Sequence, residues 1–180
     1  GQIRAGFKEW ERTRQLILED ETPELESFVL YLAAIAHHLA GDPVRALDCA
    51  KRIEAVARDI GEPPNIVAVY SAAYCCAHIV GGRPAEAVDF ARRASEIFHR
   101  VEIQLRGWAT TCLAEALFLS GDLAGAAAAA TEAIGHCRHY LGGNFVAMAQ
   151  GVRARTILRR DGKDGAAAAS EALATSAELI

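Results

Sequence analysis

The sequence lacks the features that mark several large classes of protein. No apolar stretch reaches the roughly 18 residues that a membrane-spanning helix needs, and no signal peptide is visible. The 19 Lys and Arg residues are outnumbered by 23 Asp and Glu, which gives a net charge of −4, whereas nucleic-acid-binding domains are usually basic. We therefore expect a cytoplasmic protein that engages neither a membrane nor a nucleic acid.

The cysteines are odd in number. The five residues are Cys49, Cys75, Cys76, Cys112 and Cys137. A bridge between the adjacent Cys75 and Cys76 would be strained, and the pattern is not that of a secreted disulfide framework. We expect five reduced thiols that pack as small apolar side chains.

Motifs for catalysis or cofactor binding are also missing. No Gly-x-x-x-x-Gly-Lys-Ser/Thr phosphate loop is present, and no nucleophile, base and orienting group can be assembled from the sequence. His136, Cys137 and His139 are too few to complete a zinc site. We expect no cofactor, no metal and no enzymatic activity from this segment.

The chain does contain a glycine that returns at a regular interval. Gly41, Gly82, Gly121 and Gly162 are spaced by 41, 39 and 41 residues, and a helix start follows each of them. A period of about 40 residues built from two helical stretches is typical of an α-helical repeat array. Such arrays bury apolar faces between repeats and leave a long surface for partners.

Helix punctuation divides the chain into pairs of helices. Pro follows a capping residue at Thr22-Pro23 and Asp42-Pro43, and Gly61 is a suitable helix terminator. The first helices of the pairs are expected over about 23–40, 64–81, 103–120 and 144–160, and the second over about 43–60, 84–100, 123–141 and 164–178. Residues 1–20 would be the second helix of a truncated repeat, so we expect a piece of a longer protein.

Apolar residues repeat at intervals of three and four along the second helices, as in Ala46, Ala50, Ile53 and Ala57. The last helix fits this pattern only after a one-residue slip, to Ala166, Ser170 and Leu173. The first helices are apolar nearly all round, which predicts that they form an inner layer.

The turn glycines, followed about five residues later by Ala46, Ala87, Ala126 and Ala166, resemble the tetratricopeptide (TPR) family and its longer-period relatives. The period is near 40 and not 34, and the family's Trp, Leu-Gly and Tyr positions are mostly absent. The resemblance implies an all-α fold: one domain over 1–180, a right-handed superhelix of about four and a half TPR-like antiparallel helical hairpins.

Two segments resemble a narrower group. Leu105-Arg106-Gly107-Trp108-Ala109 and the linker from Ala57 to Pro63 are similar to the repeats that follow the ATPase module of bacterial class III adenylate/guanylate cyclases and LuxR-type regulators. This resemblance implies a regulatory or scaffolding segment of a signalling protein.

Glu115 and Arg155 occupy equivalent places in successive first helices, so we expect them to be neighbours. They would form either a partly buried ion pair that sets register or a polar anchor in a groove. In the TPR family these helix positions line the concave face, which implies a partner-binding groove of Phe28, Tyr31, His38, Val69, Trp108, Thr111, Glu115, Phe118 and Arg155.

A basic end closes the fourth pair, with Arg153, Arg155, Arg159, Arg160 and Lys163. It is either a solvated helix end, whose cations suit the helix C-terminus, or a site for an acidic partner or phosphate. His37 and His78 each lie four residues before a turn glycine and are expected to pack between helices.

These observations favour a protein–protein interaction segment, a regulatory scaffold inside a multidomain bacterial signalling protein. A protein or peptide would dock in the groove. Two alternatives stay open: a small-ligand sensor with a closed pocket, and a self-association module that forms a homodimer.

Overall fold

The computed structural model describes residues 12, 22–101, 103–140 and 143–177. The helix expected over 3–20 lies outside the described residues. Contacts between residues divide the chain into two compact units, 1–97 and 98–180.

The described residues form helices and turns, without a strand. The helices are α2 (Pro23–Leu39), α3 (Pro43–Asp59), α4 (Pro64–Val80), α5 (Pro84–Val101), α6 (Ile103–Ser120), α7 (Leu123–Tyr140), α8 (Gly143–Asp161) and α9 (Ala166–Ala177), and a short 3-10 helix, η1 (Gly162–Gly165), precedes α9. These bounds differ from the expected ranges by at most two residues at each end. The prediction of an all-α fold is confirmed.

The turns between paired helices share one backbone geometry. Gly41, Gly82, Gly121 and Gly162 have φ angles of 73°, 70°, 96° and 59°, a left-handed conformation that glycine adopts without the steric cost of a Cβ. Beside the first of these glycines, the Asp42 amide donates to the carbonyl of His37 at 2.9 Å. The recurring glycine is therefore a recurring turn, at the spacing read from the sequence.

Side-chain caps start two of the helices that follow these turns, α3 and α7. Asp42 Oδ1 accepts a hydrogen bond from the Arg45 amide at 3.1 Å, and Asp122 Oδ1 accepts one from the Gly125 amide at 2.8 Å. Each cap satisfies one of the amides that have no partner inside the helix. In these two pairs the short turn and the cap bring the second helix back against the first.

In the first unit, α4 is the most buried helix. It packs against both α2 and α3, and α2 also packs against α3. Every residue of α4 from Ile66 to Ile79 is buried except Tyr74, whereas α3 buries only one stripe, Ala46, Cys49, Ala50, Ile53 and Ala57. The first helices of the pairs, α2 and α4, are therefore neighbours here, and α4 is buried nearly all round, whereas α2 exposes Leu25, Phe28, Leu32 and Leu39.

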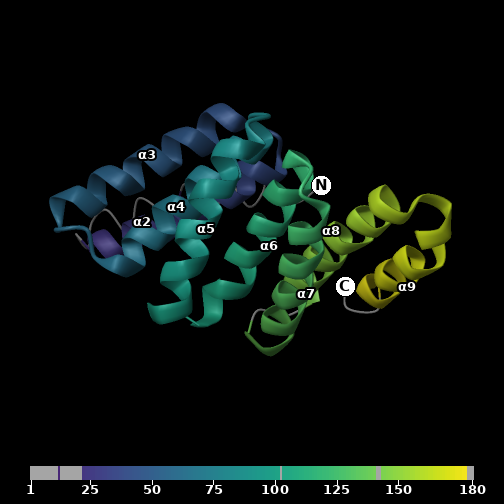
Figure 1. Ribbon diagram of the computed structural model, residues 1–180. Coiled ribbons are helices and arrows are strands. Elements are labelled where there is room, and N and C mark those ends of the chain that lie inside the picture. The colour runs from purple at the N-terminus through teal and green to yellow at the C-terminus, as the bar shows by residue number, and fades with distance from the viewer. Residues whose placement is uncertain (1–11, 13–21, 102, 141–142, 178–180) are drawn as a thin grey trace. The chain divides into compact units, whose positions relative to one another are not determined.

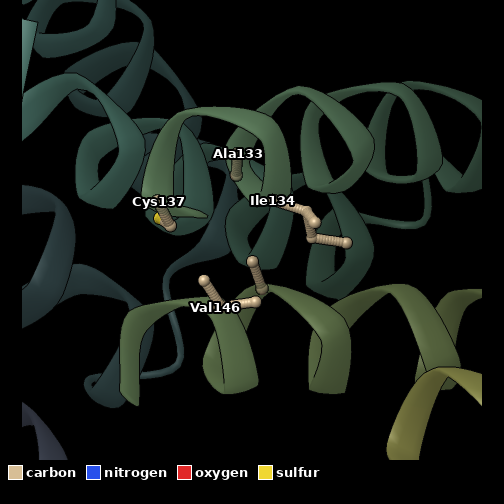
Figure 2. Close-up of a cluster of buried hydrophobic side chains, with 5 residues drawn as sticks. Ala133, Ile134, Cys137 and Val146 are labelled. Carbon is tan, nitrogen blue, oxygen red and sulfur yellow. The ribbon is translucent and has the colours of Figure 1, made fainter. Parts of the chain in front are cut away.

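In the second unit, α6 packs against α7 and α8, and α8 packs in turn against α7 and α9 (Figure 1). Figure 2 shows the core between α7 and α8, where the side chains of Ile134 and Val146 lie between the two helices. Ala133, Cys137 and Ala149 complete this buried cluster, and Phe145 packs against it. Since α6 and α8 also touch, residues at equivalent positions of these two helices come close together.

The one-residue slip expected for the last helix is wrong. Ala166, Ser170 and Leu173 are exposed, and Gly165, Ala169 and Ala172 are buried instead. A Cβ at Gly165 would lie 2.8 Å from Ile157 Cγ2 and 3.1 Å from the Ile157 carbonyl oxygen. Glycine thus takes the place that alanine holds in the earlier pairs, because the chain passes even closer to the preceding helix here.

All five cysteines lie in the described part of the chain, are buried and form no disulfide, in agreement with the expectation of unbridged thiols. A search of the described helices finds none that is long and apolar enough to cross a bilayer.

Close approach between α6 and α7 generates a first prediction. A Cβ at Gly107 would lie 2.8 Å from Cys137 Sγ and 3.0 Å from the Cys137 amide nitrogen. We expect Gly107→Ala to lower the free energy of unfolding by roughly 1–3 kcal/mol, because backbone must move to admit the methyl group. The measurement is chemical denaturation followed by circular dichroism.

Gly135→Ala is the matched control. Gly135 lies within α7, and a Cβ there meets nothing within 4 Å. Alanine should therefore raise stability by up to roughly 1 kcal/mol through its better helix propensity. Equal effects of the two substitutions would show that α6 and α7 do not approach as closely as described.

Candidate interaction surface

Glu115 and Arg155 form the ion pair expected from their repeat positions. Arg155 Nη2 on α8 donates to Glu115 Oε1 on α6 at 3.0 Å. The Glu115 side chain is 19% exposed and that of Arg155 is 48% exposed, so the pair sits at the edge of the α6–α8 contact. An ion pair in this position is partly screened by water, and its contribution to stability is modest.

Arg155 and Arg159, which share one face of α8, both place their guanidinium groups beside the Phe118 ring. The guanidinium carbon of Arg155 lies 5.2 Å from the centre of the Phe118 ring, and that of Arg159 lies 5.3 Å from it. Arg159 Nη1 also donates to the carbonyl oxygen of Phe118 at 3.1 Å. We call Glu115, Phe118, Arg155 and Arg159 the α6–α8 surface.

The charges on the α6–α8 surface do not balance. Glu115 carries one negative charge and the two arginines carry two positive charges. The Glu115 carboxylate forms its ion pair with Arg155. The neighbouring Arg160 is paired with Asp161, but no carboxylate of the described residues pairs with Arg159. Partial negative charge at the C-terminal end of α8 offsets some of this excess, and one positive charge remains beside an aromatic ring.

The nine residues of the expected groove fall in both units. Phe28, Tyr31, His38 and Val69 lie in the first unit, and Trp108, Thr111, Glu115, Phe118 and Arg155 lie in the second. The contacts bring Glu115, Phe118 and Arg155 together. The described structure does not place the two groups of residues relative to each other.

Four of the nine belong to the helix core. Tyr31, Val69, Trp108 and Thr111 are all less than 5% exposed. The Thr111 hydroxyl donates to the Gly107 carbonyl at 2.8 Å, and its oxygen lies 4.0 Å from Cys137 Sγ. Trp108 meets the Phe145 ring edge to face. We leave these four side chains out of the candidate surface.

The remaining two residues of the first unit reach the surface to different extents. Phe28 is 39% exposed. His38 is half-buried, and its Nδ1 lies 3.1 Å from the carbonyl oxygen of Cys76. His38 therefore links α2 to α4, whereas Phe28 is open to solvent.

Arg159 was absent from the expected groove, although the sequence places it in the basic end of the fourth pair. The helical spacing could have identified Arg159, because Arg155 and Arg159 are four residues apart and therefore share a face of α8. Their common contact with Phe118 depends on how α6 lies against α8, which the spacing alone does not show.

A second polar cluster lies in the first unit, where α4 meets α5. The rings of Tyr74 and Phe90 are stacked with centres 4.7 Å apart, and those of His78 and Phe90 are stacked at 5.3 Å. The Tyr74 hydroxyl donates to Glu54 Oε2 at 2.6 Å. Burial and this hydrogen bond to a carboxylate raise the pKa of Tyr74, so its hydroxyl stays protonated and ties α4 to α3.

His78 is held in its neutral form by the same packing. Burial lowers its pKa below the ordinary value of 6.5, and the positive charge of Arg83 adds to the effect. Glu86, whose Oε2 lies 3.3 Å from His78 Nδ1, opposes it. As the sequence position suggested, His78 is a packing residue between helices.

The described residues contain no group of three or more His, Cys, Asp or Glu side chains that could hold a metal ion. Cys137 lies in the α6–α7 contact, and burial raises the pKa of its thiol although the Thr111 hydroxyl opposes this. His136 Nε2 lies 3.7 Å from Glu132 on the same helix. Cys137 thus packs against α6, whereas His136 lies beside a carboxylate of its own helix.

Comparisons with known proteins add no relatives. No protein-family model matches the sequence, and no curated protein is significantly similar to it. The residues of the candidate surface are therefore the guide to function.

The ion pair generates a second prediction. In a double-mutant cycle with Glu115→Gln and Arg155→Met, we expect an interaction energy of roughly 0.3–1 kcal/mol, because the pair is well aligned but Arg155 is half exposed. Chemical denaturation measures each variant. Arg153→Met with Glu115→Gln is the control, since Arg153 lies on another face of α8 and should give additive effects.

His78 generates a third prediction. The unfolded chain takes up a proton as the pH falls through about 6.5, before the folded chain does, so the contribution of neutral His78 is present above that pH and is lost below it. We therefore expect the denaturant concentration at the unfolding midpoint to decrease as the pH is lowered from about 7 to about 5.

His78→Phe should keep the aromatic stack and weaken this pH dependence. It should not abolish it, because burial also lowers the pKa of His37 and His136. An unchanged pH profile in the variant would mean that His78 accepts a proton in the folded chain as readily as in the unfolded one.

Proposed function

We propose that this chain is a protein–protein interaction segment, a regulatory scaffold of a multidomain bacterial signalling protein. The proposed architecture is a right-handed superhelix of TPR-like helical hairpins. It is supported by the recurring left-handed turn glycines and by the contacts of α2 with α4 and of α6 with α8. The resemblance of two segments to the repeats of nucleotide cyclases and LuxR-type regulators suggests what the parent protein does.

The observation that carries the proposal is the α6–α8 surface. Aromatic rings and arginines dominate the binding energy of protein interfaces, because they bury a large area and present several donors at little entropic cost. Here two guanidiniums flank Phe118 at 5.2 and 5.3 Å, and at least half of the Arg155 side chain is withdrawn from water. Such a surface can dock a peptide or a helix of a partner protein.

Selection from a random peptide display library tests this proposal, with the whole chain as the bait. We expect enrichment of a shared motif and saturable binding of the corresponding synthetic peptide. Phe118→Ala should weaken that binding by about tenfold or more, since an interface anchor contributes about 2 kcal/mol or more.

Two variants make the result specific. Leu173→Ala removes an apolar side chain from α9 in the same unit that is 47% exposed, more than the half-buried Phe118, and binding should be unchanged. Phe118→Leu keeps most of the apolar contact and should weaken peptide binding less than Phe118→Ala does. Circular dichroism of each variant would reveal a loss of binding that is caused by misfolding. A selection that yields no motif, or binding that is insensitive to Phe118, would contradict the proposal.

Self-association is a second candidate function, favoured by α2. Leu25, Phe28, Leu32 and Leu39 are spaced by three, four and seven residues along this helix and are between 39% and 54% exposed. Exposed apolar residues on one helix face often mark an interface. Light scattering of the samples prepared for the selection would support a homodimer if it gave twice the mass of the chain.

The small-ligand sensor ranks below these two. It needs free polar groups around a closed pocket, but the hydroxyl of Tyr74 and the carboxylate of Glu115 are already engaged. The Tyr74 hydroxyl donates to Glu54, and the Glu115 carboxylate accepts from Arg155.

A further inference from the structure

Resting on the proposed function, we propose that the α6–α8 surface recognises an acidic segment of a partner protein. In this proposal Arg159 receives an Asp or Glu carboxylate of the partner, and apolar side chains of the same segment pack beside Phe118. The partner is thus an acidic, partly apolar peptide segment.

The first support is the uncompensated charge of Arg159. Arg155 already has the carboxylate of Glu115, Arg160 has that of Asp161, and no carboxylate of the described residues pairs with Arg159. Its recorded hydrogen bond goes from Nη1 to the Phe118 carbonyl oxygen. A guanidinium has five N–H donors, so several remain for a carboxylate.

The second support is that the guanidinium is already held in place. The Phe118 ring lies 5.3 Å from its central carbon, and the bond to the Phe118 carbonyl fixes its direction. Arg155 is held as well, by Glu115 and by a 3.4 Å hydrogen bond from Nε to the Gly151 carbonyl. Binding an anion would therefore cost little side-chain entropy, which is the main penalty for using a long cationic residue.

The third support is exposed apolar surface on the same faces of these two helices. Leu119 lies four residues after Glu115 on α6 and is 40% exposed, and Leu158 lies three residues after Arg155 on α8 and is 44% exposed. A purely acidic ligand would leave these side chains in water. A segment with both carboxylates and leucine-like side chains complements the surface better.

The test uses labelled synthetic peptides of about twelve residues with Leu at fixed positions. One peptide carries Glu at the polar positions, and the second carries Gln at the same positions. Fluorescence anisotropy of each peptide is titrated with the whole chain at low and high salt. We expect the Glu peptide to bind at least about tenfold more tightly than the Gln peptide and to weaken as salt increases.

Arg159 supplies the decisive variants. Arg159→Gln should weaken binding of the Glu peptide about tenfold, and Arg159→Lys should give an intermediate affinity, because lysine keeps the charge but loses the planar fork. Arg153→Gln is the matched control: Arg153 is also an exposed arginine of α8, and its loss changes the net charge by the same amount. It should change the affinity less than about twofold.

The outcomes separate this inference from the proposed function. Equal losses for Arg153→Gln and Arg159→Gln would reduce the binding to general attraction by net charge and overturn the inference. A display motif without acidic residues that still depends on Phe118, or a Glu peptide that fails to bind, would also overturn it while the proposed function stood. Absence of any Phe118-dependent motif would remove both.

Discussion

Close approach between neighbouring helices is the constraint on which each unit of this protein depends. Helices can come this near only where one side chain is small or missing. The buried stripe of α3 is mostly alanine, and in the second unit Gly107 meets Cys137 and Gly165 meets Ile157 at distances that leave no room for a Cβ. Dispersion contacts and apolar burial then accumulate over the whole length of each pair.

The candidate surface follows from this packing. With α7 against both α6 and α8, and α6 in contact with α8, the C-terminal half of α6 lies beside the C-terminal half of α8. Two arginines one helical turn apart on α8 consequently reach the same ring of α6. Glu115 neutralises only one of them, and the charge that remains gives the surface its preference for an anion.

The polar cluster of the first unit also arises from helix packing, but its role is to hold helices together. Tyr74, His78 and Phe90 stack between α4 and α5, and their polar atoms are directed to Glu54 or lie beside Glu86. Because the carboxylates there are matched to a phenol and a neutral imidazole, the cluster holds helices together and retains little capacity for a ligand. At Arg159, by contrast, a full charge lacks a carboxylate partner among the described residues.

The helices and their turns can be predicted from the sequence, since they depend on short-range effects: a capping Asp before Pro, a glycine able to adopt positive φ, and apolar residues spaced by three and four. Equivalent repeat positions also predict the contact between Glu115 and Arg155. Which of these residues lie at the surface and which lie in the core depends on how the helices pack. Trp108, Thr111 and Phe118 all belong to the set of residues expected to line the groove, but α7 and α8 cover Trp108 and Thr111. Arg159 contacts Phe118 only because α6 packs on α8. The buried stripe of α9 cannot be read from the sequence because it begins at Gly165, which has no apolar side chain. The close approach of Gly165 to Ile157 explains why a glycine is needed there.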